Sequence, residues 1–218
     1  MSTFRRRLMS ILSGKEPLPE FYNYLVGDGV AYVDTGIRIP ENGSMAGVFG
    51  YETRRAGAQN IFGAFDVGAG ETGLTFGGGT DNNYRQIVAF YDKTANVGYN
   101  TLNFNYRTFA SFLTPKRFGY GDSSKTFTKG NLRPTATLKI FGGYPTYTSY
   151  SGLLSGDFMV FDADAQNAAT WEQIMAFTPV ATFRPCIYNG EAGLWYVEEK
   201  RFCGNAAGSG SFVATNTI

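Results

Sequence analysis

The sequence predicts an all-β sandwich of two antiparallel sheets, on the evidence of its composition and its spacing. Aromatic residues make up 16% of the 218 residues, with 19 Phe and 14 Tyr, and 28 glycines accompany them. Aromatic side chains favour strands and glycines favour tight turns, whereas helical proteins are richer in Ala, Leu, Glu and Lys. From Phe21 onwards, β-prone runs recur roughly every 8–15 residues between Gly, Asn and Asp turns, a spacing typical of sandwiches. This length fits a single β domain.

The runs expected to form strands contain β-branched and aromatic side chains and are bounded by turn residues. They span residues 22–26, 30–37, 44–51, 60–65, 74–76, 84–91, 101–104, 107–113, 135–141, 156–161, 182–188, 193–196 and 200–203. Between two of these runs stand Asn189 and Gly190, a pair that predicts a tight hairpin turn.

One short helix is expected late in the chain. Thr170 and Gln173 have the spacing of a capping box, and Pro179 would end the helix. Its apolar face would consist of Trp171, Ile174, Met175 and Phe177. In a sandwich, such a helix is expected to plug an edge and to be structural.

The absence of histidine excludes several kinds of catalytic and metal site. A Ser-His-Asp triad, a Cys-His pair and a His-based zinc site all need an imidazole. Only two cysteines occur, Cys186 and Cys203, too few for a Cys-type zinc site. A disulfide between them is one alternative. Two reduced, buried thiols are favoured, because nothing else indicates a disulfide scaffold.

The first 19 residues are predicted to be a basic arm, ending at Pro17 and Pro19, before a domain that spans residues 20–218. Three arginines followed by apolar residues imitate the start of a secretory signal. The apolar run of about five residues is shorter than the roughly 7–15 that a signal core needs. We therefore expect neither a signal peptide nor a membrane span.

The arm is expected to dock onto a larger assembly. Arginines pair with carboxylates on a neighbour while apolar side chains become buried. The residues assigned to this docking are Arg5, Arg6, Arg7, Leu8 and Met9. A solvated terminus is one alternative, and a nucleic-acid-binding arm is another. We disfavour nucleic acid as a partner because the net charge is only +1 and no basic stripe follows the arginines.

Three tyrosines stand in a loop that has almost no charge: Tyr144, Tyr147 and Tyr150. Three-residue spacing aligns side chains on one face of an extended, polyproline-like segment. Tyrosine rings stack on sugars and also dominate protein interfaces. The loop is therefore a candidate for glycan or subunit contact, with ordinary packing of a long loop as the other reading.

Acidic residues are considered both as ligands and as catalysts. Asp162, Asp164 and Asn167 place oxygen atoms in one short run, as calcium loops do, but the run lacks the glycine and the distal glutamate of an EF-hand. A turn with Asx caps leading to the helix is favoured over a calcium site. Glu198 and Glu199 are adjacent and expected in a turn, so they do not form the paired carboxylates of a glycosidase. No enzyme activity, metal or cofactor is predicted.

Patterns near both ends of the chain resemble one known family. Residues 24–36 read Tyr-Leu-Val-Gly-Asp-Gly-Val-Ala-Tyr-Val-Asp-Thr-Gly. Near the other end stand Phe-Arg-Pro-Cys at 183–186, Gly-Leu-Trp at 193–195 and Phe-Cys-Gly-Asn at 202–205. Together they are similar to the laminin-G-like jelly roll of the concanavalin A-like lectin superfamily, in the form found in gut bacterial surface proteins and bacteriophages. The resemblance covers residues 22–213, apart from the stretch 54–133.

The resemblance implies a jelly-roll sandwich in which the two chain ends pair as neighbouring strands. Together with the missing export signal, it implies an accessory structural protein of a phage virion: a capsid decoration, head-fibre or tail-associated subunit. Such a protein is expected to contact other virion proteins, to form homo-oligomers and to touch host glycans. The alternative is a carbohydrate-binding module of a bacterial surface or secreted protein.

Overall fold

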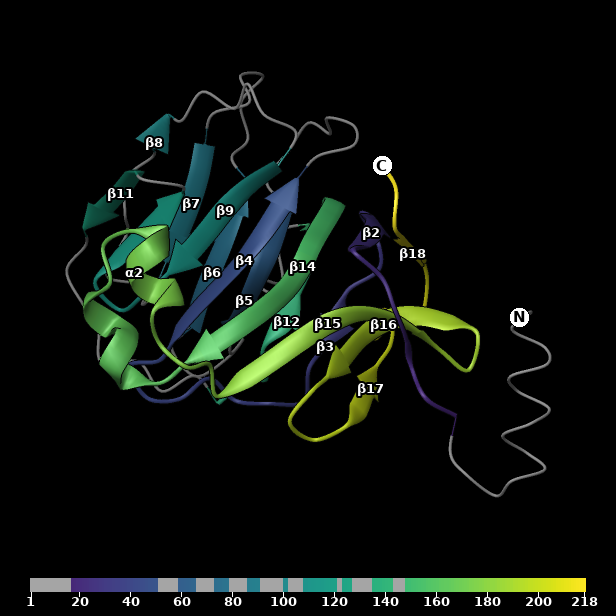
Figure 1. Cartoon of the computed structure of the whole chain (residues 1–218). Coiled ribbons are helices and arrows are strands. Elements are labelled where there is room, and N and C mark those ends of the chain that lie inside the picture. Colours follow the sequence, from purple (N-terminus) through teal and green to yellow (C-terminus); the bar gives the residue numbers. More distant parts are fainter. Residues whose placement is uncertain are drawn as a thin grey trace.

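The computed structural model describes residues 17–50, 59–65, 73–78, 86–90, 100–101, 108–120, 123–126, 135–142 and 148–218. In these ranges the chain forms two β-sheets, two short helical segments and connecting turns (Figure 1). The predicted all-β two-sheet sandwich is therefore confirmed. No helix in these ranges is long and apolar enough to cross a membrane.

The first sheet has 11 strands, and most of them follow one path. In spatial order the path contains β11 (Ser123–Thr126), β10 (Arg117–Tyr120), β9 (Thr108–Leu113), β4 (Ser44–Gly50), β14 (Ser151–Phe161), β15 (Ala181–Tyr188), β16 (Glu191–Tyr196) and β17 (Arg201–Cys203). Three further strands join beside this path: β1 (Glu20–Phe21), β2 (Tyr24–Asp28) and β18 (Phe212–Thr215).

The second sheet has seven strands and contains the middle of the chain. Its path is β3 (Val33–Asp34), β12 (Lys139–Ile140), β5 (Gln59–Phe65), β6 (Gly73–Gly78), β7 (Gln86–Phe90) and β8 (Asn100–Thr101). The last strand, β13 (Thr148–Ser149), pairs in parallel with β5.

The first sheet forks at β14. One edge of β14 pairs with β4, while the other edge pairs with β2 over residues 151–155 and with β15 over residues 158–160. The pairing with β4 shifts register between Ser155 and Met159, and Gly156 there has a φ of +70°. A bulge with a left-handed glycine bends the strand, so that its two halves pair with different strands.

The N-terminal strand crosses this fork. Phe21 on β1 pairs with Cys186 on β15. The carbonyl of Asn23 then accepts a 2.8 Å hydrogen bond from the Gly156 amide, after which β2 runs along β14. One continuous segment thus ties the two branches together.

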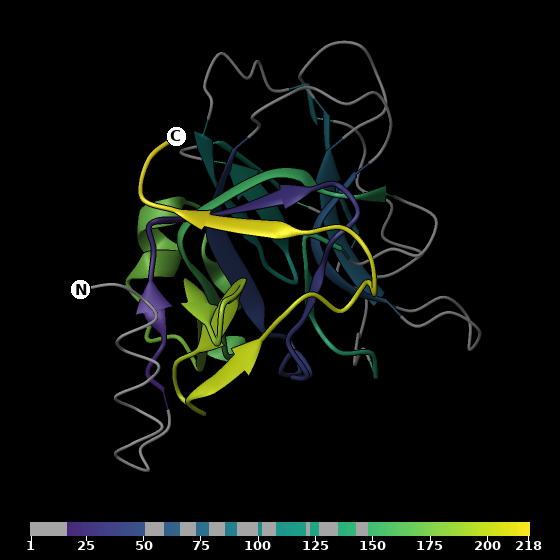
Figure 2. The same ribbon diagram turned by 90° about the vertical axis from the view of Figure 1, so that its right-hand side faces the viewer.

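The two chain ends lie side by side, as the sequence predicts. β18 pairs antiparallel with β2, and Figure 2 shows the C-terminal strand (yellow) beside the N-terminal one (purple). The amide of Ser211 donates to the Asp28 carboxylate over 2.6 Å, and Val33 and Asn205 form an isolated bridge. Strands from both ends therefore complete one sheet.

The main core lies between the two sheets and is rich in phenylalanine. Phe49 on β4 lies 5.8 Å from Phe62 on β5, measured between ring centroids, and Phe62 lies 5.0 Å from Phe158 on β14. Phe141 contacts Phe212 of β18 at 5.4 Å. These rings are fully buried except for Phe212, which is 8% exposed. Alternating residues of the strands supply this layer, as a sandwich requires.

A second, smaller cluster covers the outer face of the first sheet. The 3-10 helix η1 (Ala163–Asn167) and the helix α2 (Trp171–Met175) place Ala165 and Ile174 on Ala46, Phe112 and Phe161. The predicted cap is confirmed, because the Thr170 hydroxyl accepts a 3.3 Å hydrogen bond from the Gln173 amide. The helix packs on a sheet face, however, and not at an edge as expected, since Ala46 and Phe112 point outwards there.

Several predicted strands are shorter than expected. Of residues 30–37 only Val33–Asp34 pair as a strand, because Gly36 turns the chain with a φ of +70°. Of residues 135–141 only Lys139–Ile140 pair, and Phe141 ends that strand with a φ of 65°.

Candidate functional site

Most of the proposed contact residues lie outside the described ranges. Arg5, Arg6, Arg7, Leu8 and Met9 of the arm lie there, and so do Tyr144 and Tyr147.

Tyr150 lies within the described part of the chain and corrects the prediction. It is fully buried, its ring stacks on Phe141 at 5.8 Å, and its hydroxyl donates a 2.8 Å hydrogen bond to the Gly50 carbonyl. A satisfied ring inside the core offers no surface to a glycan or a subunit.

The acidic turn near the helix is structural, as favoured from the sequence. The Asp162 carboxylate accepts a 2.7 Å hydrogen bond from the Ala163 amide and caps the 3-10 helix. The amide oxygen of Asn167 accepts a hydrogen bond from the Lys116 ammonium group. Among the described residues, no three His, Cys, Asp or Glu side chains gather closely enough to hold a metal ion.

The two cysteines are free and buried, which confirms the favoured reading. Cys186 on β15 pairs with Gly193 on β16, and Cys203 on β17 pairs with Leu194 on β16. Because Gly193 and Leu194 are adjacent on that strand, the two thiols point to opposite faces of the sheet. Burial raises the pKa of the Cys186 thiol from 9.0 to about 12, and burial also raises that of Cys203.

A cluster of partly exposed rings lies on the outer face of β15, β16 and β17, and it is named here the outer aromatic face. It comprises Tyr188, Trp195 and Phe202, together with Phe21 and Arg184 beside them. The centroid of Tyr188 lies 5.4 Å from that of Trp195 and 5.6 Å from that of Phe202. Trp195 pairs across the strands with both Arg184 and Phe202, which puts the three side chains on one face.

Gly193 explains why these rings converge. A Cβ atom at this position would lie 2.8 Å from the Phe202 ring and 2.5 Å from the Cys203 carbonyl. Without a side chain there, the Phe202 ring lies close over the backbone of β16. Cys186, which pairs with Gly193 on the same face, is fully buried.

Arg184 is held at the rim of the outer aromatic face. Its Nε and Nη2 atoms donate hydrogen bonds of 2.8 and 2.7 Å to the two carboxylate oxygens of Asp157. The guanidinium also lies 5.4 Å from the centroid of the Phe21 ring. The hydrogen bonds to Asp157 raise the pKa of Arg184 above its ordinary value, so the group stays charged.

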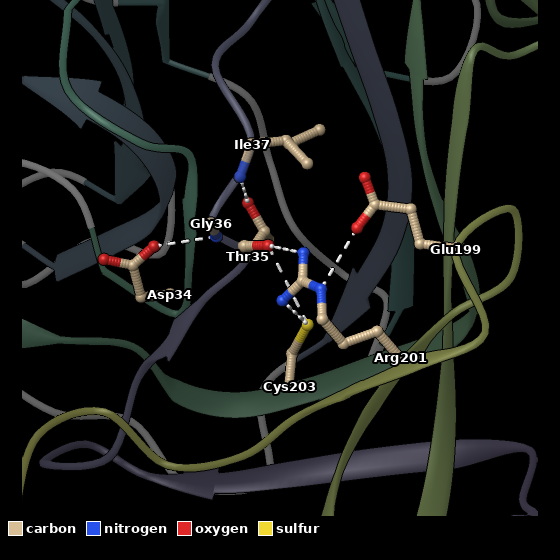
Figure 3. A network of polar contacts seen from close by, with 7 residues as sticks. All are labelled: Asp34, Thr35, Gly36, Ile37, Glu199, Arg201 and Cys203. Carbon is tan, nitrogen blue, oxygen red and sulfur yellow. Dashed lines mark hydrogen bonds and ion pairs between the residues drawn. The ribbon is translucent and has the colours of Figure 1, made fainter.

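A second polar network joins the two chain ends (Figure 3). The Arg201 guanidinium donates from Nη2 to the Thr35 carbonyl over 2.7 Å and from Nη1 to the Cys203 sulfur over 3.3 Å. Its Nε atom lies 3.1 Å from the Glu199 carboxylate. Figure 3 places this guanidinium beside the turn at Gly36, where a Cβ atom would lie 3.4 Å from it.

The network around Arg201 is a clasp that joins β17 to the turn at Thr35 and Gly36. The Asp34 carboxylate accepts hydrogen bonds from the Gly36 amide and the Thr137 hydroxyl, both at 2.9 Å. These contacts shape the turn and engage the carboxylate on both oxygens. Glu198, in the predicted turn, accepts a 2.8 Å hydrogen bond from the Thr182 amide, while Glu199 pairs with Arg201. Each of these carboxylates therefore has a structural task.

The sequence alone does not single out the outer aromatic face. Trp195 and Phe202 belong to the patterns near the C-terminal end, and Tyr188 belongs to a predicted strand. One signal was available: residues 184, 186 and 188 alternate along a strand, so Tyr188 and Arg184 share a face. Their neighbours across the sheet can be assigned only once the register is known.

Comparisons with known proteins leave the family open. No family model matches the chain, and no curated protein matches it. Among solved structures, the chain is similar to a Trypanosoma rangeli sialidase in complex with sialic acid, with 12% identity and a TM-score of 0.46. The match covers 69% of this chain and 26% of that one. The same sialidase with the inhibitor DANA gives 13% identity, a TM-score of 0.46 and a coverage of 68% and 26%. The chain therefore spans about a quarter of the sialidase, and a likeness this weak carries no argument about activity.

Proposed function

We propose that this protein is a non-enzymatic accessory structural component of a bacteriophage virion, as a capsid decoration, head-fibre or tail-associated subunit. The laminin-G-like patterns at both chain ends support the proposal. In this proposal the sandwich is displayed outwards, the N-terminal arm contacts other virion proteins, and the protein forms homo-oligomers.

One structural observation carries the docking part of the proposal. Leu18 is 88% exposed, and it stands where the arm meets the domain. Burial of such an exposed apolar side chain under a partner lowers the free energy of the complex. β1 fixes this junction to β15, so a docked arm would hold the sandwich in a defined place.

Particle incorporation tests the proposal. Purified particles should contain the protein in a mass-spectrometric inventory, and a variant lacking residues 1–19 should fold but stay out of them. Leu18→Asp should lower incorporation, because a charge there opposes burial. Ile218→Asp, at a residue 59% exposed at the other chain end, is the matched control and should be incorporated normally. Normal incorporation of the truncated variant would contradict docking through the arm.

The second candidate function is a carbohydrate-binding module of a bacterial surface or secreted protein. The outer aromatic face favours it, because aromatic rings on a rigid sheet are a common platform for sugars. Neighbouring genes separate the two candidates: capsid, portal and tail genes favour the virion, and polysaccharide-degradation genes favour the module. In the second case, fractionation of the bacterial host would find the protein at the cell surface and not in particles.

A further inference from the structure

We propose that the outer aromatic face binds a neutral oligosaccharide, with one pyranose ring stacked on Trp195 and hydroxyl groups along the oligosaccharide bonded to Arg184 and to Glu191 at the rim. This inference rests on the lectin-like part of the proposed function and gives it a site and a ligand class. It also places glycan contact on a different surface from the Tyr144–Tyr150 loop.

The platform is open on its outer side. Trp195, Tyr188 and Phe202 are all partly exposed, and Phe21 is 45% exposed. In Figure 1 the helical segments lie over β4 and β9, away from β15, β16 and β17, and the N-terminal segment (purple) passes across β15, with which β1 pairs. Rings that would be sheltered in the core thus face solvent here, at one end of the sandwich.

The platform is also rigid before any ligand arrives. Tyr188 and Trp195 stand on a two-residue hairpin whose turn residues, Asn189 and Gly190, have φ angles of 53° and 85°. The rings pack on one another, so little side-chain entropy remains to be lost on binding. A weakly held ligand such as a sugar depends on this kind of preorganisation.

The polar groups at the rim match the hydroxyl groups of an oligosaccharide that runs along the sheet. Nε and Nη2 of Arg184 are engaged by Asp157, which leaves the Nη1 protons directed elsewhere. Glu191 is exposed, and its Oε1 atom accepts a 3.3 Å hydrogen bond from the Asn205 amide, which leaves the second oxygen as an acceptor. A pyranose has an apolar face of C–H groups and a rim of hydroxyls that both donate and accept. It therefore fits a ring platform with a donor and an acceptor beside it.

Charge selects a neutral sugar over an acidic one. The positive charge of Arg184 is already balanced by Asp157, and Glu191 adds a further negative charge on the same face of the sheet. An anionic sugar would meet this surplus carboxylate without gaining an unpaired cation. A purely apolar protein partner would fit less well, because it would cover the half-exposed Arg184 and the carboxylate of Glu191 without pairing either one.

Tryptophan fluorescence provides a direct assay, because the chain has only two tryptophans. Trp171 is the first residue of α2 and packs against the second cluster, so a Trp171→Phe variant reports on Trp195 alone. This variant would be titrated with neutral gluco-, manno- and galacto-oligosaccharides, and with oligogalacturonate and sialyllactose as acidic comparators. We expect a saturable change in Trp195 emission with at least one neutral oligosaccharide and none with the acidic sugars.

Variants of the full-length protein assign the site by an independent calorimetric titration. Trp195→Ala should weaken binding about tenfold or more, as truncation of a central aromatic contact does. Arg184→Lys keeps the charge but loses the planar fork, and it should also weaken binding. Trp171→Phe is the matched control and should bind normally. Circular dichroism and melting temperatures would be recorded for each variant, and Trp195→Phe serves if Trp195→Ala does not fold.

Any of three results would overturn the inference: no neutral oligosaccharide gives saturable binding, the folded Trp195 variant retains full affinity, or acidic sugars bind as tightly as neutral ones. The assay uses isolated protein and is independent of particle incorporation. Sugar binding by a protein that is absent from particles would sink the virion proposal and leave this inference standing. Normal incorporation without sugar binding would overturn this inference and leave the virion proposal standing.

Discussion

Arg201 shows how a single side chain can join the two ends of a chain. It stands on β17 near the C-terminus and donates to the Thr35 carbonyl, 166 residues earlier in the sequence. Its guanidinium also lies 5.5 Å from the centroid of the Tyr196 ring. A hydrogen bond from a charged donor is stronger than one between neutral groups, and a partly buried carbonyl has few other partners.

Replacement of Arg201 by methionine tests this clasp. The variant keeps the apolar stem but loses the donors, so we expect the free energy of unfolding to fall by about 1–2 kcal/mol. Urea denaturation would measure the change. Glu199→Gln is the control: its carboxylate is 54% exposed, and exposed ion pairs contribute little, so a change of less than about 0.5 kcal/mol is expected. Equal losses in both variants would contradict the assigned role of the Thr35 contact.

The Cys186 thiol provides a test that depends on pH. Burial raises its pKa from 9.0 to about 12, so the folded state keeps its proton in a range where the unfolded chain loses it. The stability contributed by the protonated thiol is therefore complete below pH 9 and is lost as the pH rises towards 12. We expect native Cys186 to react slowly with iodoacetamide at mildly alkaline pH and rapidly in urea, as followed by peptide mass spectrometry. Rapid labelling of the native protein would contradict this.

Tyr150 marks the limit of what residue spacing can predict. Three tyrosines at equal intervals in an uncharged loop have the composition of a contact surface. The same composition also suits a loop that leads into a strand, with its last tyrosine ring turned into the core. Tyr150 takes this second arrangement, and its hydroxyl bonds to the Gly50 carbonyl, 100 residues away in the sequence. Such a contact leaves no local trace in the sequence, whereas the Thr170 cap, which is made within three residues, was predicted correctly.

At the level of elements, β14 depends on its glycines for different reasons. Gly156 adopts a left-handed conformation at the bulge, where a Cβ atom would meet only open space. Gly152, on the same strand, has no such room: a Cβ atom would lie 2.3 Å from the Gly50 carbonyl and 2.6 Å from the Tyr150 ring. One glycine is required by backbone geometry and the other by the closeness of β4.

Alanine substitutions separate these two requirements. Gly156→Ala should lower the free energy of unfolding by about 1–2 kcal/mol, the cost of a left-handed alanine. Gly152→Ala should cost more, because the clash involves backbone and a buried ring. Melting temperatures of the two variants would establish the order. A milder effect at Gly152 than at Gly156 would show that β4 and β14 can move apart at little cost.

Elements were predictable where the signal was local. The Asn189–Gly190 turn and the strands on both sides of it follow from turn chemistry and alternation. Residues 151–155 were not predicted as strand, because Ser and Gly there have low β propensity. They are held in the sheet by pairing with β2 and β4 on both edges, which is tertiary information. β10 and β11 were missed for the same reason, since neighbouring strands define them.

At the level of the whole molecule, the paired chain ends close the sandwich. Phe212 and Val213 are neighbours on β18 with opposite environments: Phe212 is 8% exposed against Phe141, while Val213 is 57% exposed. Patterns near both chain ends led to the prediction that these ends pair, and the pairing of β2 with β18 confirms it. The fork of β14 was not predicted, because no sequence pattern indicates which neighbouring strand pairs with which edge of β14.

Substitution of Phe212 and Val213 tests how much the pairing of β18 contributes to the stability of the domain. Phe212→Ala should cost about 3 kcal/mol by leaving a cavity beside Phe141. For a domain of this size, that loss corresponds to a melting temperature lower by about 6 °C or more. Val213→Ala on the exposed face should change stability by less than about 0.5 kcal/mol. Equal effects at both positions would contradict the inward packing of β18.

The order in which these strands are made has a further consequence. A ribosome delivers β2 long before β18, yet each is the lateral neighbour of the other. During synthesis, the part of the Phe141 ring that Phe212 covers stays exposed until β18 emerges. Completion of the sandwich therefore waits for β18, and a nascent chain stalled before β18 would be a natural client for chaperones.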